Sequence, residues 1–191
     1  MNPIQKFKEW YTRELEMSTA KIPSACCLGS IGQDGYPNAR FVSLKEVVND
    51  TFVITGPLNS RKGTELLANP KASLAFWWAA TERQVRIQGD AIPIDNEQAD
   101  RYFKERSRES QIVSIMSQQG QQIENHKELI RKFEQQTSEK PDTPMGRPPE
   151  WSGFYIHPQR IEFMEFNENR FHFRELFSRE GENWTRVLLQ P

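Results

Sequence analysis

Three polar residues, Tyr102, Arg106 and Ser110, are spaced four residues apart. On one continuous helix, steps of four residues place side chains on one face, within roughly 80° of arc. A phenol, a guanidinium and a hydroxyl on one face can hold a phosphate, because arginine offers a fork of donors and each hydroxyl adds one hydrogen bond. The same pattern suits an ordinary solvated helix face. Spacing alone therefore favours a solvated face and permits a phosphate anchor.

Two further groups of cations occur earlier in the chain. Arg40 and Lys45 lie in a β-prone segment, where alternation places them on opposite faces unless a bulge intervenes. They equally suit edge-strand charges that oppose aggregation. Ser60, Arg61 and Lys62 begin a predicted helix, whose free N–H groups and positive dipole end bind anions. Because cations there oppose the dipole, we interpret this segment as a phosphate cradle.

A polar strand face is predicted from the alternation in residues 82–89. Gln84, Arg86 and Gln88 share one face, and apolar residues take the other. Amides and a guanidinium on one face can hydrogen-bond the edge of a flat heterocycle. On pattern alone, an outward polar face explains these residues as well.

A cationic strand face is predicted near the C-terminus. Alternation places Arg170, His172 and Arg174 on one side of a strand. Three such residues would repel one another unless an anion lies between them, and the flanking arginines favour a neutral imidazole. We therefore expect ligand binding here, with His172 as a neutral hydrogen-bonding group.

The elements that position these residues follow from hydrophobic periodicity and turn residues. Helices are predicted at residues 4–18, from Ser60 to about Asn69, and near 96–106, 108–118 and 124–137. Strands are predicted at residues 25–31, 38–47, 51–55, 72–79, 84–94, 153–156, 160–166, 170–177 and 184–189. A proline-rich linker at residues 140–149 leads into the C-terminal strands of residues 151–191. About seven antiparallel strands with inserted helices predict a single domain, residues 1–191, that is mainly β with helices (α+β) and closes a barrel.

Composition narrows the class of protein. The 191 residues carry a formal net charge of -1, which offers no general attraction to nucleic acid or to an anionic membrane. No apolar run reaches the length of a transmembrane helix, and the first residues lack the apolar core of a signal peptide, so we expect a cytoplasmic protein. Cys26 and Cys27 are adjacent and lack metal-ligand spacing, so neither a structural disulfide nor a metal site is predicted.

The cationic sites outnumber what one phosphate requires. A flavin mononucleotide (FMN) and a phosphorylated substrate would account for two separate anion sites. No Ser-His-Asp ordering or reactive-cysteine setting competes with that interpretation. Because no side-chain set in the sequence is redox-active, electron transfer would require the cofactor.

Seven motifs then occur in one order along the chain. They are Arg40-x4-Lys45, Ser60-Arg61-Lys62, Glu82-Arg-Gln-Val85, Tyr102-x3-Arg106-x3-Ser110-Gln111, Trp151-x-Gly153, Ile161-Glu-Phe163 and Arg170-x-His172-x-Arg174. Together, from about residue 20 to Pro191, they resemble the pyridoxamine 5'-phosphate oxidase family. Each motif is weak by itself, but seven in order are specific.

The resemblance implies an FMN-binding split β-barrel, a Greek-key-like antiparallel barrel, that forms a homodimer with two FMN molecules between the subunits. It implies oxidation of pyridoxine or pyridoxamine 5'-phosphate to pyridoxal 5'-phosphate, with electrons passing through FMN to oxygen and hydrogen peroxide released. By position, the FMN-binding residues would be Arg40, Lys45, Thr55, Arg61, Lys62, Gln84, Gln119 and Arg174. The substrate phosphate would contact Lys45, Tyr102, Arg106 and Ser110. The catalytic residues at the substrate ring would be Arg170 and His172.

The chain departs from the family pattern at several positions. Met164 and Phe173 replace a tryptophan and an aspartate, while Gly120 and Ser107 replace a serine and a proline. Met164 and Phe173 belong to the C-terminal strands, so they bear on the substrate ring rather than on its phosphate. Two alternatives therefore stay open: a related FMN-dependent oxidase of another aromatic substrate, as in phenazine biosynthesis, and a non-catalytic flavin- or B6-binding module.

Overall fold

The computed structural model describes residues 2–139 and 144–191. In these ranges the helices are α1 Pro3–Met17, α2 Arg61–Ala68, α3 Asn96–Lys104, α4 Arg108–Met116 and α5 His126–Glu139. The strands are β1 Ala25–Ile31, β2 Pro37–Val48, β3 Thr51–Pro57, β4 Lys71–Trp78, β5 Arg83–Pro93, β6 Trp151–Glu165, β7 Phe173–Glu180 and β8 Asn183–Leu189. The predicted elements occur in the predicted order, except that two predicted strands are joined in β6.

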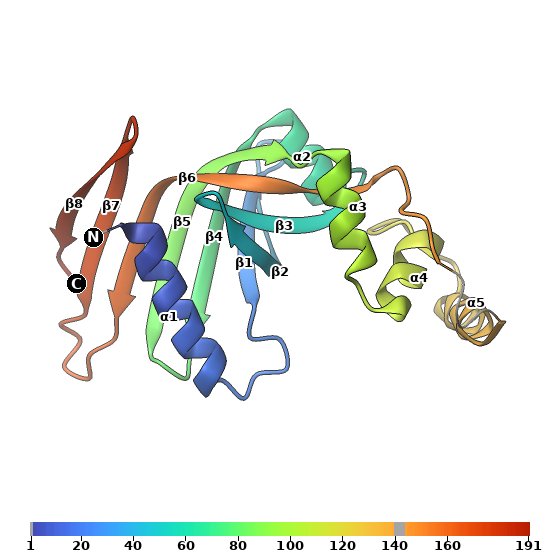
Figure 1. Ribbon diagram of the computed structural model, residues 1–191, viewed down its shortest axis with the longest axis horizontal. Helices are drawn as coiled ribbons and strands as arrows, with labels where there is room; N and C mark the ends of the chain where they lie inside the picture. Colours follow the sequence, from blue (N-terminus) through green and yellow to red (C-terminus); the bar gives the residue numbers. More distant parts are fainter. Residues whose placement is uncertain (1, 140–143) are drawn as a thin grey trace.

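Six antiparallel strands, β1 to β6, close a barrel (Figure 1). The sheet runs in the order β3-β2-β1-β4-β5-β6-β7-β8, and a further pairing of β3 with β6 closes the ring. Every second side chain of β4 is buried, as expected for a strand with one face on the core. The predicted class, mainly β with helices around a closed antiparallel barrel, is therefore confirmed. Strands β7 and β8 lie outside the ring and extend the sheet.

Strand β6 is one long element where the sequence predicts two strands. Pro158 lies in the gap between the two predicted strands, and proline, which cannot donate a ladder hydrogen bond, often ends a strand. Instead, the register on β5 shifts between Gln88 and Gly89, so that Gln159 is the extra residue of a bulge beside the proline. The first half of β6 pairs with β3 and the second half with β7. This strand therefore joins the barrel to the C-terminal hairpin.

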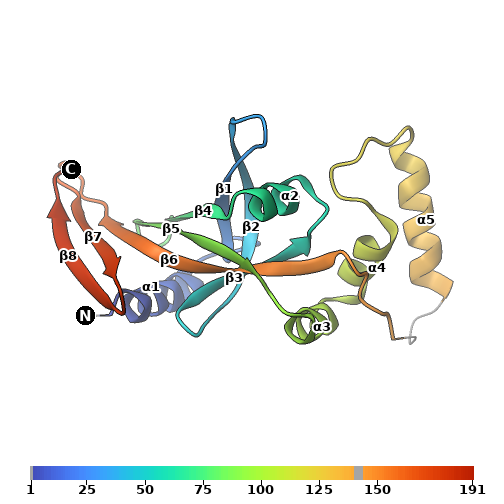
Figure 2. The ribbon, with the colours of Figure 1, turned by 90° about the horizontal axis from the view of Figure 1, so that it is seen from above.

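Helix α1 packs its apolar stripe against the barrel. Asn2 caps the helix by accepting a hydrogen bond from the Ile4 N–H at 2.8 Å, and a proline occupies the first turn. Phe7 is fully buried, with its ring centroid 4.8 Å from that of Phe52. Figure 2 shows α1 beside the β7–β8 hairpin, and an ion pair joins Lys6 to β7.

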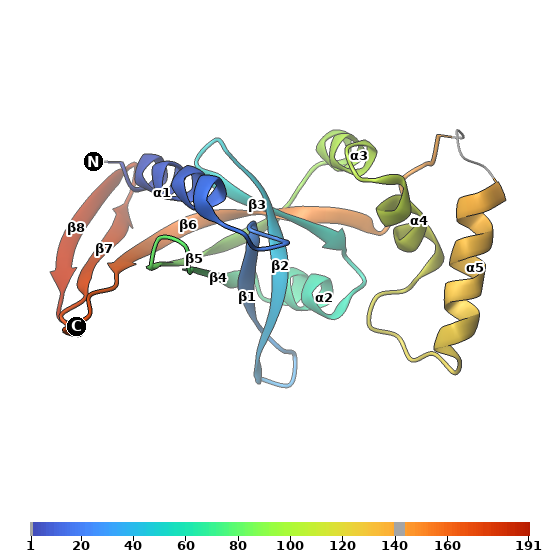
Figure 3. The same ribbon diagram turned by 90° about the horizontal axis from the view of Figure 1, so that it is seen from below.

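Helices α3, α4 and α5 lie at the end of the molecule opposite β7 and β8 (Figures 1 and 3). Helix α3 packs on β6 through a second buried cluster that includes Tyr102, Phe103 and Trp151. Of the predicted linker at 140–149, residues 140–143 lie outside the described residues, and 144–148 form no regular secondary structure. None of the helices in the described part of the chain is long and apolar enough to cross a membrane.

Candidate active site

A pocket of about 330 Å³ opens where strands β2 and β3 meet helix α4. This volume lies in the range of small-molecule sites. Its polar lining includes Thr55, Lys62, Arg106 and Gln119, and the ring of Trp151 lies beside them. Four of the residues predicted from the sequence therefore share one pocket. The other predicted site residues do not line it.

Helix α2 presents Lys62 to this pocket. Ser60 caps the helix by accepting a hydrogen bond from the Gly63 N–H at 3.4 Å, as the sequence predicts. The Lys62 ammonium donates to Ser60 Oγ at 3.1 Å and to Gln119 Oε1 at 2.6 Å. Burial, and to a lesser degree the charge of Arg40, lowers the pKa of Lys62 to about 8. An anion bound beside Lys62 would therefore restore the charge that burial disfavours.

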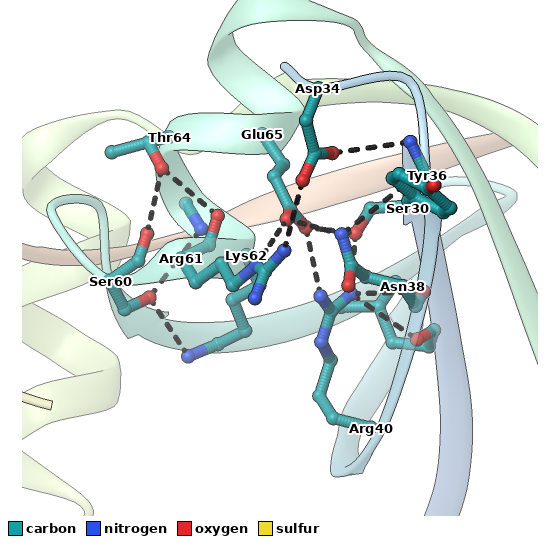
Figure 4. A network of polar contacts seen from close by, with 12 residues as sticks. Ser30, Asp34, Tyr36, Asn38, Arg40, Ser60, Arg61, Lys62, Thr64 and Glu65 are labelled. Atoms are coloured by element: carbon teal, nitrogen blue, oxygen red, sulfur yellow. Dashed lines mark hydrogen bonds and ion pairs between the residues drawn. The ribbon is translucent and has the colours of Figure 1, made fainter. Parts of the chain in front are cut away.

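Glu65 pairs with two further predicted cations, Arg61 of the predicted cradle and Arg40 of strand β2 (Figure 4). Arg40 Nη2 donates to Glu65 Oε2 at 2.8 Å, and Arg61 Nε donates to Glu65 Oε1 at 3.0 Å. Ser30 and Asn38 donate to the same carboxylate at 2.5 and 2.8 Å. Burial alone would raise the pKa of Glu65, but the hydrogen bonds from Ser30, Arg61 and Arg40 outweigh it and lower that pKa. Both arginines therefore neutralise a buried carboxylate.

A β-bulge sets the direction of Lys45. The register of β2 against β3 shifts between Leu44 and Glu46, which leaves Lys45 as the extra residue. The sequence predicts that Arg40 and Lys45 lie on opposite faces of the strand unless a bulge intervenes, and this is such a bulge. Lys45 Nζ lies 2.7 Å from Glu105 Oε2 and 5.5 Å from the ring centroid of Tyr102. The bulge therefore directs Lys45 toward the C-terminal end of α3.

Tyr102, Arg106 and Ser110 do not lie on one continuous helix, so the condition for a shared helix face is not met. Helix α3 ends at Lys104, and Ser107 caps the new helix α4 by accepting a hydrogen bond from the Ser110 N–H at 3.3 Å. A serine side chain that bonds the backbone in this way starts a helix and breaks the one before it. Residues four apart on either side of this turn therefore do not lie on the same helix face.

The Tyr102 hydroxyl is used within the fold. It donates to the Glu46 carboxylate, and burial together with that hydrogen bond raises the pKa of the phenol. Arg101 Nη2 also donates to Glu46 Oε1, at 2.7 Å. Tyr102 therefore joins α3 to β2. Of the predicted trio, Arg106 alone lines the pocket.

Arg106 has unused hydrogen-bonding capacity. Its guanidinium lies 5.1 Å from the ring centroid of Trp151, and Nη2 donates to the Ser110 carbonyl at 3.3 Å. Its Nε is buried and has no hydrogen-bond partner among the residues that the structure describes. Burial also lowers the pKa of Arg106. A buried N–H without a partner costs about 1–3 kcal/mol, a penalty that a ligand oxygen would remove.

A second group of predicted residues lies on the extended sheet. Gln84, Met164 and Arg174 are cross-strand neighbours on β5, β6 and β7. Arg174 donates to Glu162 Oε1 from Nη2 at 2.5 Å and from Nε at 3.0 Å, and Arg86 Nη1 donates to Glu162 Oε2 at 3.2 Å. The β5 side chains of this group form the partly exposed face that alternation predicts.

Arg170 lies in a turn, so its predicted place in a strand is wrong. Strand β7 begins at Phe173, whereas Arg170 has a φ of 66° and its N–H donates to the Asn167 carbonyl at 2.9 Å. The Asn169 side chain accepts a hydrogen bond from the Phe171 N–H at 2.9 Å. Such local asparagine bonds compete with strand pairing. Arg170 therefore does not share a strand face with the residues that follow it.

His172 is held just before β7 by backbone and aromatic contacts. Its Nδ1 accepts a hydrogen bond from the Asn167 N–H at 3.1 Å, so this nitrogen carries no proton. Its ring centroid lies 4.4 Å from that of Phe166, which in turn packs edge-on against Trp77. Nδ1 of His172 is therefore held by the backbone of the turn that precedes β7.

Sequence reasoning does not single out the carboxylates Glu46, Glu65 and Glu105. Two of them directly adjoin predicted cations in the sequence, and Glu65 follows Arg61 by four residues on α2. That spacing is typical of ion pairs within a helix, so the pair between Arg61 and Glu65 could have been predicted from the sequence. The pairings that cross between elements could not be found from spacing.

Two family models cover most of the chain. Residues 17–140 match the model described as pyridoxamine 5'-phosphate oxidase, and residues 151–191 match the one described as the pyridoxine 5'-phosphate oxidase C-terminal dimerisation region. The chain belongs to the pyridoxamine 5'-phosphate oxidase family. The expected family membership is thereby confirmed, and membership supports an oxidoreductase activity connected with vitamin B6.

Curated relatives match the whole length of the chain. The pyridoxine/pyridoxamine 5'-phosphate oxidase of Rubrobacter xylanophilus is 39% identical over 190 residues, which cover 100% of this chain and 87% of that protein. The protein of the same name from Sphingopyxis alaskensis is 38% identical over 190 residues, with 100% and 88% covered. The match therefore extends through both the barrel and the C-terminal hairpin.

Solved structures agree with the fold. The structure of PhzG from Burkholderia lata 383, in complex with tetrahydrophenazine-1-carboxylic acid, superposes with a TM-score of 0.92 at 25% identity and covers 100% of this chain and 93% of that one. A pyridoxamine 5'-phosphate oxidase-related, FMN binding protein from Nostoc punctiforme gives a TM-score of 0.81 at 16% identity, with 100% and 98% covered. The second similarity is one of fold alone.

Proposed function

We propose that this protein oxidises pyridoxamine or pyridoxine 5'-phosphate to pyridoxal 5'-phosphate, with FMN as cofactor and oxygen as electron acceptor, and releases hydrogen peroxide. The observation that carries the proposal is the pocket that brings Lys62, Gln119 and Arg106 together in a member of this family. The pocket offers one charged group for a cofactor phosphate and a second for a substrate phosphate.

The residues present fit an FMN phosphate. Lys62 would supply a cation whose charge an anion stabilises, and Gln119 and Thr55 would supply neutral polar groups in the same lining. Gly56 leaves room for the Lys62 side chain at the pocket, because a Cβ atom at this position would lie 3.0 Å from the Lys62 amine. Arg61 would contribute positive potential from the first turn of α2. When bound, FMN would supply the two-electron chemistry that no side chain in this set can provide.

The substrate phosphate would lie on Arg106. The buried Nε of this residue lacks a partner within the described ranges, and a phosphate oxygen is an acceptor of suitable charge. Packing of the guanidinium on Trp151 would fix its direction before the substrate arrives. Lys45, from the bulge of β2, and Ser110, on the first turns of α4, would add the remaining contacts.

A second copy of the chain would complete the site. Arg170, His172 and Arg174 belong to the β7 end of the molecule, whereas Arg106 and Gln119 belong to the α3–α5 end (Figures 1 and 2). One chain cannot bring both groups to one ligand in this conformation. A homodimer with twofold symmetry would place the β7 end of each subunit at the pocket of the other. The match of residues 151–191 to a dimerisation region supports this arrangement.

In the assembled site, the chain's own groups would bind and orient the substrate. Arg170 would lie over the substrate ring, and the Nε2–H of His172 would donate to the ring hydroxyl. Met164, beside Arg174 on the sheet, would contact the isoalloxazine region with a flexible thioether where the family pattern has a tryptophan.

The test is a product assay. Purified protein is examined for flavin absorbance and then incubated in air with a panel of B6 phosphates, while pyridoxal 5'-phosphate and hydrogen peroxide are measured. We expect both products from pyridoxine or pyridoxamine 5'-phosphate. A yellow protein without either product would contradict the proposed substrate.

A related oxidase of another aromatic substrate is the second candidate. The similarity to the Burkholderia lata protein favours it, as does Met164, which lies beside Arg174 on the sheet where the family pattern has a tryptophan. This candidate predicts substrate-dependent flavin bleaching and reoxidation with a phenazine-type substrate and no turnover of B6 phosphates. A non-catalytic flavin- or B6-binding module would show no bleaching with either substrate class.

A further inference from the structure

The residues proposed for the substrate phosphate belong to a network that already contains two carboxylates. Lys45 Nζ lies 2.7 Å from Glu105 Oε2, and Arg101 Nη1 lies 3.5 Å from Glu105 Oε1. Arg101 also donates to Glu46, which accepts the hydroxyl of Tyr102. Four charged side chains and the phenol of Tyr102 therefore join the bulge of β2 to the C-terminal end of α3.

The charges of this network cancel. Lys45 and Arg101 contribute two positive charges, and Glu46 and Glu105 contribute two negative charges. The hydrogen bond from Lys45 holds the pKa of Glu105 below its ordinary value, so the carboxylate is ionised at neutral pH. Arg106 alone then adds an unbalanced cation, which is less than a phosphate dianion normally recruits.

Glu105 is placed to move aside. It is the C-cap residue of α3, its side chain is 43% exposed, and it retains Arg101 as a second partner when Lys45 turns away. Glu46 differs, because it also accepts a hydrogen bond from the buried Tyr102. Of the two carboxylates, Glu105 is the one that a ligand can displace without disturbing the packing of α3.

We propose that Glu105 competes with the substrate phosphate for Lys45 and is a specificity-determining residue of this site. The inference rests on the proposed function, since it takes the phosphate of the substrate to bind beside Arg106. A phosphate ester that is also held by its ring displaces Glu105, whereas a singly charged or unanchored anion gains too little from Lys45 to do so. The internal carboxylate thereby lowers the affinity of the site for phosphorylated substrates and leaves its affinity for unphosphorylated ones unchanged, so it sets the ratio between the two.

The test compares Glu105→Gln with the matched control Glu97→Gln. Glu97 is an exposed carboxylate in the first turn of the same helix. For Glu105→Gln, we expect the KM for pyridoxine 5'-phosphate to fall about fivefold, because one partly exposed ion pair no longer opposes binding. The KM for unphosphorylated pyridoxine should not change, and Glu97→Gln should leave both values as they are. In a Lys45→Gln background, the gain from Glu105→Gln should disappear.

Two kinetic results would overturn the inference: an unchanged or raised KM in Glu105→Gln, or the same gain with Lys45 replaced. Equilibrium titration with pyridoxal 5'-phosphate separates this inference from the proposed activity. If the protein binds that compound but oxidises no B6 phosphate, the proposed activity fails. The competition is then tested by comparing the dissociation constants of wild type and Glu105→Gln, and the inference requires a lower value for Glu105→Gln. If neither wild type nor Glu105→Gln binds it, the inference is refuted as well.

Discussion

Replacing Arg106 with alanine separates substrate binding from cofactor binding. Arg106 packs on Trp151 and carries a buried Nε without a partner among the described residues, while Lys62 and Gln119 are hydrogen-bonded to each other in the lining of the same pocket. If Arg106 holds the substrate phosphate, its removal acts on the substrate. The FMN content should then stay close to that of the wild type.

The magnitude follows from the contacts of the guanidinium. A hydrogen bond to a charged group contributes about 2 kcal/mol, which corresponds to a roughly thirtyfold rise in KM for the phosphorylated substrate. Loss of the Trp151 contact removes up to about 1 kcal/mol of stability, and loss of the unsatisfied buried N–H offsets part of it. The melting temperature should therefore change by less than about 4 °C.

The assay measures KM and kcat for pyridoxine 5'-phosphate and for unphosphorylated pyridoxine, together with flavin absorbance. Lys104→Ala removes an exposed cation two residues away and serves as the control. We expect it to change neither parameter substantially. An equal rise in KM for both substrates, or a parallel loss of FMN from Arg106→Ala, would refute the assignment of Arg106 to the phosphate.

Three further predictions concern the cofactor and the assembly. Because the pKa of Lys62 is about 8 in the free protein, FMN binding should weaken as the pH rises through this value, whereas riboflavin binding should not. Lys62→Gln should remove this pH dependence. If FMN and riboflavin affinities depend on pH in the same way, Lys62 does not contact the FMN phosphate. Arg61→Ala should reduce FMN affinity less than Lys62→Ala, because Arg61 donates to Glu65 and lies outside the pocket lining; isothermal titration of the apoprotein measures the difference. Mixing equal amounts of Arg106→Ala and Arg170→Ala chains, at a substrate concentration where each alone is nearly inactive, should restore about a quarter of wild-type activity, since half of randomly formed dimers carry one intact site. No recovery after confirmed subunit exchange would mean that both residues act within one chain.

Most helices and strands of the fold could be predicted from residues that are neighbours in the sequence. The cap at Ser60, the capping of α1 and the alternation of β4 and β5 depend on neighbours in sequence, so they could be predicted. The bulge beside Pro158, which joins two predicted strands into β6, could not be predicted because it is set by the partner strand β5. Pairing of β3 with β6, which closes the barrel, likewise joins segments far apart in the chain.

The candidate site was predicted less completely than the fold. Lys62, Gln119, Thr55 and Arg106 meet in one pocket, whereas Tyr102 is turned to Glu46 by a contact that no spacing reveals. The break at Ser107 agrees with the two separate helices predicted at 96–106 and 108–118, whereas the local asparagine bonds before β7 override the alternation predicted for residues 170–174. The roles of these residues remain predictions, since geometry alone places side chains without assigning their ligands.

The central claim is that this chain oxidises a phosphorylated B6 vitamer with a bound flavin. The most direct measurement is the stoichiometry of products when the purified, flavin-loaded protein meets pyridoxine 5'-phosphate in air. We predict one pyridoxal 5'-phosphate for each hydrogen peroxide, with much less product from the unphosphorylated vitamer at the same concentration. A flavin-loaded protein that forms neither compound from any B6 phosphate would contradict the claim.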